Sequence, residues 1–194
     1  MFAYVLPALS YLLGSVSSAI VIARVMGLED PRKVGSRNPG ATNILRYGGK
    51  TAAVLTLLGD VLKGAIPVAV ARLLTDDPPI LAATAFAAFI GHLFPVFHGF
   101  KGGKGVATAL GVWFALSPWI GLLLVGTWIA MALLFRYSSA AALAAAAATP
   151  FYAAWILSAP SYVAMSVAMS LILIARHAKN IRNLLAGKEA RIGR

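Results

Sequence analysis

The stretch HGFKGGKGVAT, residues 98–108, is the part of the sequence best suited to bind a phosphate. Four glycines and two lysines fall within its first eight positions. Glycine-rich turns expose backbone N–H groups and lysine adds positive charge, so together they can hold an anion. The spacing is not that of a Walker A nucleotide loop, because only three residues separate Gly99 from Gly103. We therefore predict a phosphate site without nucleotide specificity; the alternative is a basic, flexible loop between two helices.

A second polar stretch, residues 24–50, also carries groups that bind anions. It contains Ser36 and Asn38, whose hydroxyl and amide groups donate hydrogen bonds. It also contains Arg46, whose guanidinium group forms charge-assisted pairs with phosphate. We call this stretch the polar segment. The alternative is a turn that satisfies its own polar groups and contacts anionic lipid headgroups.

The C-terminal stretch, residues 176–194, adds a histidine. His177 and Asn180 lie three residues apart, so a helix that continues from the preceding apolar run would place both side chains on one face. Neutral imidazole can accept a proton during catalysis. A histidine at a membrane boundary is more often a structural hydrogen-bonding group, and the sequence leaves both interpretations open.

The elements that must position these groups follow from a very apolar composition. Only 12% of the 194 residues are charged and the mean hydropathy is +0.82, whereas soluble chains carry about 25% charged residues. The sequence therefore predicts an all-α integral membrane protein. It contains no cysteine, which excludes disulfides, thiolate nucleophiles and cysteine-based metal sites.

Seven apolar runs are candidates for membrane spans, each of which needs about 20 residues. One long run is divided at Pro118, because proline ends a helix and turns the chain. The first half of that run is short for a bilayer, so five spans with a re-entrant pair is the alternative. The seven predicted segments are residues 2–23, 51–74, 79–97, 105–116, 118–135, 138–157 and 161–176.

The distribution of positive charge predicts the orientation. With seven spans, all of the 17 lysines and arginines except Lys63 and Arg72 fall on one side of the membrane. Positive charge marks the cytoplasmic side, so the N-terminus is predicted outside and the C-terminus in the cytoplasm. Topology thus explains the basic charge without nucleic acid. We predict a single polytopic membrane domain, residues 1–194, with cytoplasmic segments at 24–50, 98–105 and 176–194.

Taken together, the three segments resemble the bacterial acyl-phosphate glycerol-3-phosphate acyltransferases, the PlsY family. The resemblance rests on GSRNPGATNILR, GHLFPVFHGFKGGKGVATALG and RHAKNIRNLLAGKE, and it covers essentially the whole chain in order and spacing. It implies a multi-pass enzyme of the bacterial inner membrane whose active site faces the cytoplasm. The implied reaction moves a long-chain acyl group from acyl phosphate to sn-glycerol 3-phosphate. The products are 1-acyl-glycerol 3-phosphate and phosphate, in the first step of phospholipid synthesis.

The resemblance also implies roles for individual residues, no cofactor and no obligatory protein partner. The family commonly has glycine where this chain has Arg37, so Arg37 receives no role. The residues carried over are Ser36, His177 and Asn180 as catalytic groups, Asn38, Arg46, Gly102, Gly103, Lys104 and Gly105 as substrate-binding groups, and Glu189 as structural support.

The implied chemistry suits these side chains. An acyl phosphate is a mixed anhydride with a good leaving group, so no covalent enzyme intermediate is required. Holding two anionic substrates in register can contribute roughly 7 to 11 kcal/mol. The attacking hydroxyl loses its proton either to His177 or to the substrate's own phosphate, with His177 then a hydrogen-bonding clamp; we favour the clamp. The six acidic residues are scattered, so we expect no metal.

Two further observations leave alternatives. Asp60 and Lys63 lie inside a predicted span, where ionisable residues are often functional, although a mutually satisfied pair that supports the site is an equal alternative. A membrane carrier for small phosphorylated metabolites would also need a basic pocket and several spans. Chemical turnover separates the carrier from the acyltransferase.

Overall fold

A computed structural model describes residues 2–193, and every regular element in that range is a helix, as the sequence predicts. The chain forms two compact units, one up to Leu116 and one from Ser117 onward. The elements of the first unit are η1 (Phe2–Val5), α1 (Leu6–Gly14), α2 (Ser18–Val25), α3 (Ala41–Tyr47), α4 (Gly49–Leu74), α5 (Pro78–Leu93), η2 (Val96–His98) and α6 (Val106–Leu116). Those of the second are α7 (Pro118–Phe135), α8 (Ser138–Ile156), α9 (Pro160–Arg176) and α10 (Ala178–Leu185).

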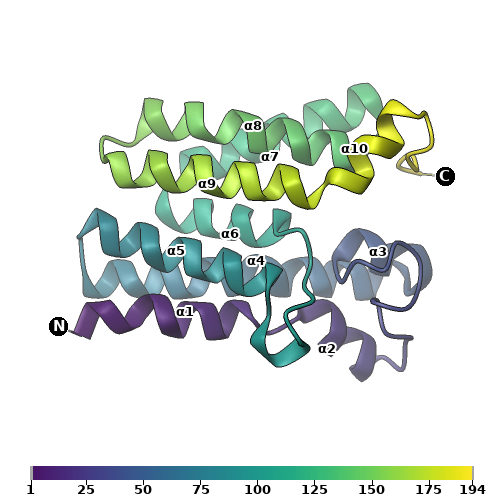
Figure 1. Cartoon of the computed structure of the whole chain (residues 1–194), viewed down its shortest axis with the longest axis horizontal. Helices are drawn as coiled ribbons and strands as arrows, with labels where there is room; N and C mark the ends of the chain where they lie inside the picture. The colour runs from purple at the N-terminus through teal and green to yellow at the C-terminus, as the bar shows by residue number, and fades with distance from the viewer. Residues whose placement is uncertain (1, 194) are drawn as a thin grey trace. The chain divides into compact units, whose positions relative to one another are not determined.

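In the first unit, α4 is the helix around which the others pack. It contacts α1, α2, α3, α5 and α6, and α1 also lies along α5 (Figure 1). Its 26 residues give a length of about 39 Å, enough to cross the hydrocarbon core of a bilayer. In the second unit, α8 packs against both α7 and α9, and the short α10 contacts α8 and α9 (Figure 1).

The helices of the first unit approach closely where glycines face a neighbouring backbone. A Cβ on Gly64 of α4 would overlap the carbonyl oxygen of Thr108 in α6, and one on Gly111 of α6 would overlap that of Val61. The contact of α1 with α5 has the same character at Gly14. Small residues are the usual means by which helices associate in membranes, where no hydrophobic effect drives them together.

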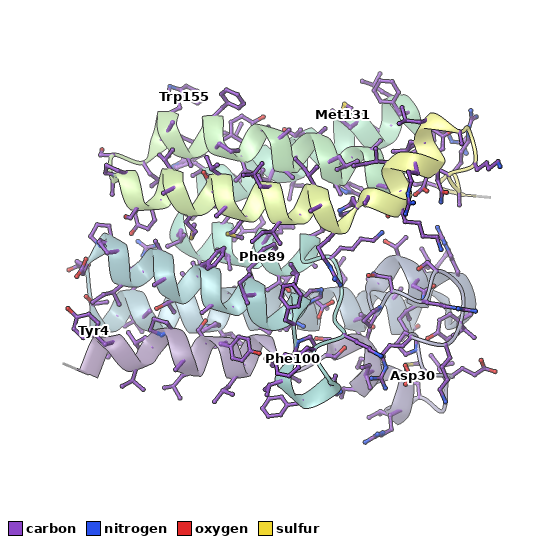
Figure 2. All side chains as sticks on the ribbon, in the orientation of Figure 1. Tyr4, Asp30, Phe89, Phe100, Met131 and Trp155 are labelled. Atoms are coloured by element: carbon purple, nitrogen blue, oxygen red, sulfur yellow. The ribbon has the colours of Figure 1, made fainter. Side chains whose placement is uncertain are left out.

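Large apolar side chains occur both inside the units and on their surfaces. Phe89 is fully buried, whereas Trp155 is 79% exposed and points outward in Figure 2. Leu73 and Leu133 are similarly exposed. A soluble protein rarely exposes so much apolar surface, but a surface that faces lipid does.

Within residues 2–193, length and hydropathy identify four helices that could each cross a membrane: α4, α5 extended to His98, α7 and α8. The number rises to six if two bent pairs each form one span. The first pair, α1 with α2, is bent by 41°, so the predicted continuous segment 2–23 is interrupted at residues 15–17. With 11 residues, or about 17 Å, α6 is shorter than the roughly 30 Å hydrocarbon core.

Two helix boundaries were addressed by the sequence analysis. The break at Pro118 is confirmed, because α6 ends at Leu116 and α7 begins at Pro118, with Ser117 as its N-cap. The expectation that the last span continues as one helix through His177 is wrong. α9 and α10 meet at His177 with a bend of 59°, because His177 has the backbone angles of a helix end, φ −93° and ψ 9°.

We predict that Gly111→Ala destabilises the protein by about 1 to 3 kcal/mol, since its Cβ would meet the backbone of α4. Thermal unfolding in detergent measures the loss. Gly126 of α7 is the matched control, because a Cβ there meets nothing within 4 Å. Gly126→Ala should be neutral or stabilising by up to about 1 kcal/mol. Equal melting temperatures for the two variants would contradict the close packing of α4 with α6.

Candidate active site

The polar segment is organised around the buried side chain of Asn43, on α3. Asn43 Oδ1 accepts a hydrogen bond from the Ser36 backbone N–H at 2.9 Å. Its Nδ2 donates to the carbonyl oxygens of Pro31 at 2.9 Å and Val34 at 3.1 Å. One amide side chain therefore satisfies three backbone groups and fixes the turn that presents Ser36. Sequence reasoning did not select Asn43, because its importance lies in its partners and not in its spacing.

The same turn requires glycine and is closed by an ion pair. Gly35 has φ +60°, and a Cβ there would overlap Oδ1 of Asn43. Nearby, Arg32 donates to both carboxylate oxygens of Asp30, with a shortest N···O distance of 2.6 Å. These hydrogen bonds from Arg32 lower the pKa of Asp30 to about 2. The predicted residues Ser36 and Arg46 are exposed on this framework, and Asn38 is half-buried.

The glycine loop, residues 102–105, folds onto the end of α5. The Gly102 N–H donates to the carbonyl oxygen of Leu93 and the Gly103 N–H to that of His92, both at 3.2 Å. The sequence analysis expected these N–H groups to face a phosphate, but the structure uses both for internal hydrogen bonds. The first N–H groups of α6, which begins at Val106, have no partner within their own helix, and a helix N-terminus is suited to an anion.

The glycines of this loop are required by close contacts. A Cβ on Gly103 would overlap Nε2 of His92 and would lie 3.0 Å from the carbonyl oxygen of Pro39. A Cβ on Gly105 would overlap the ring of Phe89, and its φ of +89° is one that glycine adopts most readily. The structure thus brings the glycine loop against the polar segment at Pro39, and Lys104 is held between these glycines.

In the second unit, His177 is buried where α9 meets α10. Its Nδ1 lies 2.8 Å from the carbonyl oxygen of Leu173. A backbone carbonyl only accepts hydrogen bonds, so the neutral imidazole carries its proton on Nδ1. Its Nε2 is then the acceptor, the protonation state that a base or a partner for a substrate hydroxyl requires. The carbonyl of Leu173 therefore orients this ring.

Glu189 connects three side chains of the same unit. Its Oε1 accepts from Asn180 Nδ2 and from Ser139 Oγ, each at 2.7 Å, and its Oε2 accepts from Asn183 Nδ2 at 3.3 Å. The bond to Nδ2 fixes which way the Asn180 amide points and leaves its Oδ1 as an acceptor. Ser139 and Asn183 were not among the predicted site residues, and no spacing rule would have found them.

The segment that carries Glu189 is tied to the connection between α7 and α8. The Ile192 N–H donates to the carbonyl oxygen of Arg136 at 2.7 Å. Arg191 Nε donates to the Tyr137 hydroxyl at 3.2 Å, and its guanidinium lies 5.5 Å from the centre of that ring. These contacts hold the tail so that Glu189 reaches Asn180.

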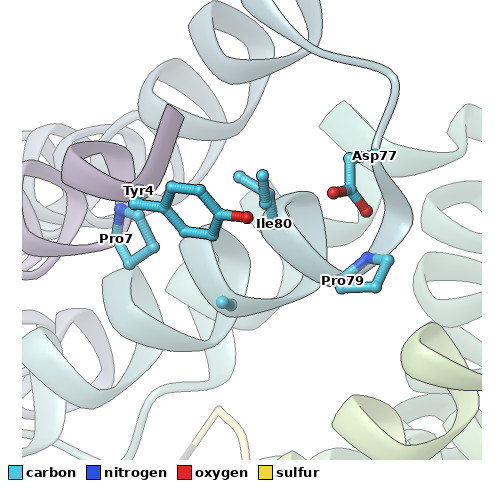
Figure 3. Close-up of a pocket in the computed structure, with 6 residues that line it drawn as sticks. Tyr4, Pro7, Asp77, Pro79 and Ile80 are labelled. Atoms are coloured by element: carbon cyan, nitrogen blue, oxygen red, sulfur yellow. The ribbon is translucent and has the colours of Figure 1, made fainter. Parts of the chain in front are cut away.

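A surface hollow in the first unit lies away from the predicted residues. Figure 3 shows it between the start of α1 and the start of α5, with the Tyr4 hydroxyl and the Asp77 carboxylate as its labelled polar groups. Its remaining lining residues are Pro7, Pro79, Ile80 and Ala83. None of the residues carried over from the resemblance belongs to it.

Fold and side chains together define a class of protein: an all-helical integral membrane protein with lysine and arginine side chains in its polar loops. The family model described as glycerol-3-phosphate acyltransferase matches residues 4–187, and the chain belongs to this family. A relative of that name from Methylococcus capsulatus is 55% identical over 184 residues, 95% of this chain and 93% of the relative.

Two solved structures share the fold. The crystal structure of PlsY, an integral membrane glycerol 3-phosphate acyltransferase, in its glycerol 3-phosphate form has a TM-score of 0.94 and 41% identity. The form with lysophosphatidic acid has a TM-score of 0.92 and 39% identity. Each match covers 100% of this chain and 96% of the other. The family resemblance drawn from the three segments is confirmed.

We predict that Asn43→Ala loosens the polar segment, because a backbone N–H and two carbonyls lose their partner, at a cost of about 1 to 3 kcal/mol. Tryptic cleavage after Arg32 and Arg37 should then be about tenfold faster or more, since cleavage follows local opening. Thr42→Ala, at the exposed neighbouring position on α3, should leave the rate unchanged. Equal rates for the two variants would refute the role of Asn43.

Proposed function

We propose that this enzyme forms 1-acyl-glycerol 3-phosphate from glycerol 3-phosphate with an acyl phosphate as donor, in the first step of phospholipid synthesis. The assignment of the acceptor and the product rests on the family match along residues 4–187. It also rests on the likeness to PlsY in forms with glycerol 3-phosphate and lysophosphatidic acid. The acyl phosphate donor is what the resemblance to the PlsY family implies. It is compatible with the chain's lack of cysteine, because an acyl phosphate already carries a good leaving group and needs no covalent enzyme intermediate.

In the reaction a hydroxyl oxygen of glycerol 3-phosphate attacks the acyl carbonyl carbon. The bond between that carbon and the phosphate oxygen breaks, and phosphate leaves with the bonding electrons. We assign Lys104, Arg46 and the first N–H groups of α6 to the substrate phosphates, because cations and helix N-termini stabilise anions. Ser36 and Asn38 orient polar groups of the substrates. The glycines of the loop have an indirect role: they allow the loop backbone to lie close to His92 and Phe89. These glycines are Gly102, Gly103 and Gly105.

For the proton, we assign His177 and Asn180 to a hydrogen-bonding clamp and the leaving phosphate to proton acceptance. Support comes from the two orienting bonds, His177 Nδ1 to Leu173 and Asn180 Nδ2 to Glu189. Each bond directs an acceptor atom, Nε2 or Oδ1, away from its own partner. Two fixed acceptors can hold the hydroxyl groups of glycerol 3-phosphate in the orientation that attack requires.

We propose that the chain lies in the bacterial inner membrane with the N-terminus outside and the polar segment, glycine loop and C-terminus in the cytoplasm. The excess of lysine and arginine in these segments supports this orientation. The finer count of seven spans, with α6 among them, is part of the same proposal; five spans with a re-entrant pair is its alternative.

The orientation predicts how single cysteines react in the otherwise cysteine-free chain. A cysteine at the exposed Lys101 should react only with reagents that reach the cytoplasm, and one at the exposed Asp77 should react from outside. Labelling with a membrane-impermeant maleimide in intact and in permeabilised cells measures both. Reaction of position 101 in intact cells would reverse the orientation and place the phosphate site outside.

Lys104→Ala should lower kcat/KM by about 10- to 150-fold, because a charge-assisted contact contributes about 1.5 to 3 kcal/mol. Phosphate release by purified protein, given acyl phosphate and glycerol 3-phosphate, measures the effect and also excludes a carrier, which would release none. Lys101→Ala is the matched control, since it removes an exposed lysine from the same loop. An equal loss of kcat/KM in both variants would mean that Lys104 contributes only positive charge to the loop and makes no specific contact with a substrate phosphate.

His177→Gln separates the two proton-transfer schemes. If His177 is the general base, its loss should lower the rate of acyl transfer by about 100- to 10,000-fold. If His177 is a clamp, the enzyme should retain much of its activity with an amide in place of imidazole. In the clamp scheme the His177→Ala, Asn180→Ala double variant is little worse than the poorer single variant. Lys179→Ala, on the same short helix, is the control.

The outcomes are measured as rates of phosphate release in folded, detergent-purified protein. A His177→Gln enzyme within about tenfold of the unaltered enzyme would exclude obligatory base catalysis by this histidine. A loss of more than about 100-fold, with unchanged affinity for glycerol 3-phosphate, would exclude the clamp.

A further inference from the structure

Three ionisable side chains form a buried cluster in the first unit. Asp60 and Lys63 lie one turn apart on α4, with 2.8 Å between Oδ1 and Nζ. The Nδ1 of His92, at the end of α5, lies 3.6 Å from the same carboxylate oxygen. Asp60 is 2% exposed, and Lys63 and His92 are each 6% exposed. We call these three residues the buried cluster.

Helix packing alone does not account for such a cluster. Moving charged groups out of water costs several kcal/mol each, and apolar residues of similar volume are often at least as stabilising as a buried ion pair. Ionisable residues inside a membrane protein therefore often have a function that apolar residues could not fulfil. The other contacts of the buried cluster indicate what that function is.

One contact of the buried cluster reaches the interruption between α1 and α2. Lys63 Nζ donates a hydrogen bond of 2.8 Å to the carbonyl oxygen of Val16, in the short break between the two helices. A carbonyl at such a break has lost its helical partner, and Lys63 supplies one. The buried cluster thus fixes α4 against the point where the chain turns toward the polar segment.

The other contact is with the glycine loop, through His92. The backbone carbonyl of His92 accepts from the Gly103 N–H, and the space that a Cβ on Gly103 would fill is occupied by Nε2 of the imidazole. The ring therefore lies with Nδ1 toward Asp60 and Nε2 against the backbone of Gly103. Any rotation of the ring away from Asp60 changes the surface on which the glycine loop rests.

We propose that Asp60, Lys63 and His92 are positioning residues for the acyl transfer: they hold the glycine loop in the conformation that presents Lys104 and the start of α6 to a substrate phosphate. The proposal rests on the phosphate-binding role proposed for that loop. Asp60 holds the imidazole, Lys63 compensates the charge of Asp60 and anchors it to Val16, and His92 transmits the position to Gly103. None of the three has to touch substrate.

The test combines a structural and a kinetic measurement on His92→Gln and Asp60→Asn. Both substitutions nearly preserve volume and remove the ring or the charge that holds it. The amides of Gly102 and Gly103 should exchange hydrogen with solvent about tenfold faster, because their bonds to the end of α5 open more often. A displaced loop should lower kcat/KM by about 10- to 100-fold, because small misplacements of substrate-holding groups have effects of this size.

The matched control is Ser10→Ala. Ser10 is as deeply buried in the same unit, and its hydroxyl donates to the Thr84 carbonyl oxygen at 2.7 Å between α1 and α5. Loss of this bond should lower stability but leave exchange in the glycine loop and kcat/KM unchanged. If Ser10→Ala alters both as strongly, the effect of the buried cluster is general destabilisation and the proposal is wrong.

The two measurements separate the proposal from the function on which it rests. Faster exchange with lower kcat/KM supports both. Faster exchange with unaltered kinetics supports the positioning of the loop but overturns its role in phosphate binding. Unchanged exchange in folded variants overturns the positioning role, whatever the kinetics.

If removal of one charge prevents folding, two other variants retain the test. The Asp60→Asn, Lys63→Met pair removes both charges and leaves none unpaired. Gly103→Ala introduces the Cβ that would overlap His92, so it should impair activity in the unaltered protein. It should add less to His92→Ala, because only the 3.0 Å approach to the Pro39 carbonyl oxygen then remains. Independent, additive losses from Gly103→Ala and His92→Ala would refute contact between the ring and the loop as the basis of positioning.

Discussion

The contact between the glycine loop and the end of α5 is the constraint on which the candidate site residues of the first unit depend. Two hydrogen bonds and the absence of side chains at Gly102 and Gly103 allow the loop backbone to lie directly on His92 and Leu93. That position in turn sets Lys104, the start of α6 and the approach of the loop to Pro39. Any Cβ at these two glycines would move all of these groups together.

The helices that support this contact are themselves held by glycine. α4 and α6 touch at Gly64 and Gly111, so α6 is fixed just beyond the loop that precedes it. At the other end of the loop, α5 is fixed against α1 at Gly14. Because lipid offers no hydrophobic drive for helices to associate, close backbone contact provides the rigidity that the proposed phosphate site would need.

Hydropathy was sufficient to predict an all-helical membrane protein, and the rule that proline ends a helix was sufficient to place the boundary at Pro118. The three polar segments were also identifiable, since glycine, arginine and histidine are conspicuous in an apolar sequence. The role of Asn43 was not accessible from the sequence, and Glu189 was named only through the family resemblance, without the partners that it holds. Each matters through the backbone or side-chain groups that it satisfies, and such partners are chosen by tertiary structure. The bend at His177 was missed because no proline or glycine marks it.

The second unit prepares its two predicted catalytic side chains by the same physical means. His177 Nδ1 donates a hydrogen bond to the Leu173 carbonyl oxygen and Asn180 Nδ2 donates one to Glu189, so the other polar atoms, Nε2 of the neutral ring and Oδ1 of the amide, are hydrogen-bond acceptors. Acceptors alone suit a substrate whose hydroxyl groups must be oriented before attack. They do not suit an anionic phosphate, which would be repelled by the lone pairs of both. Hydrogen-bond polarity is thus the basis of the proposed roles: the cations and helix N–H groups of the first unit are proposed for phosphate, and the acceptors of His177 and Asn180 in the second unit are proposed for glycerol hydroxyls.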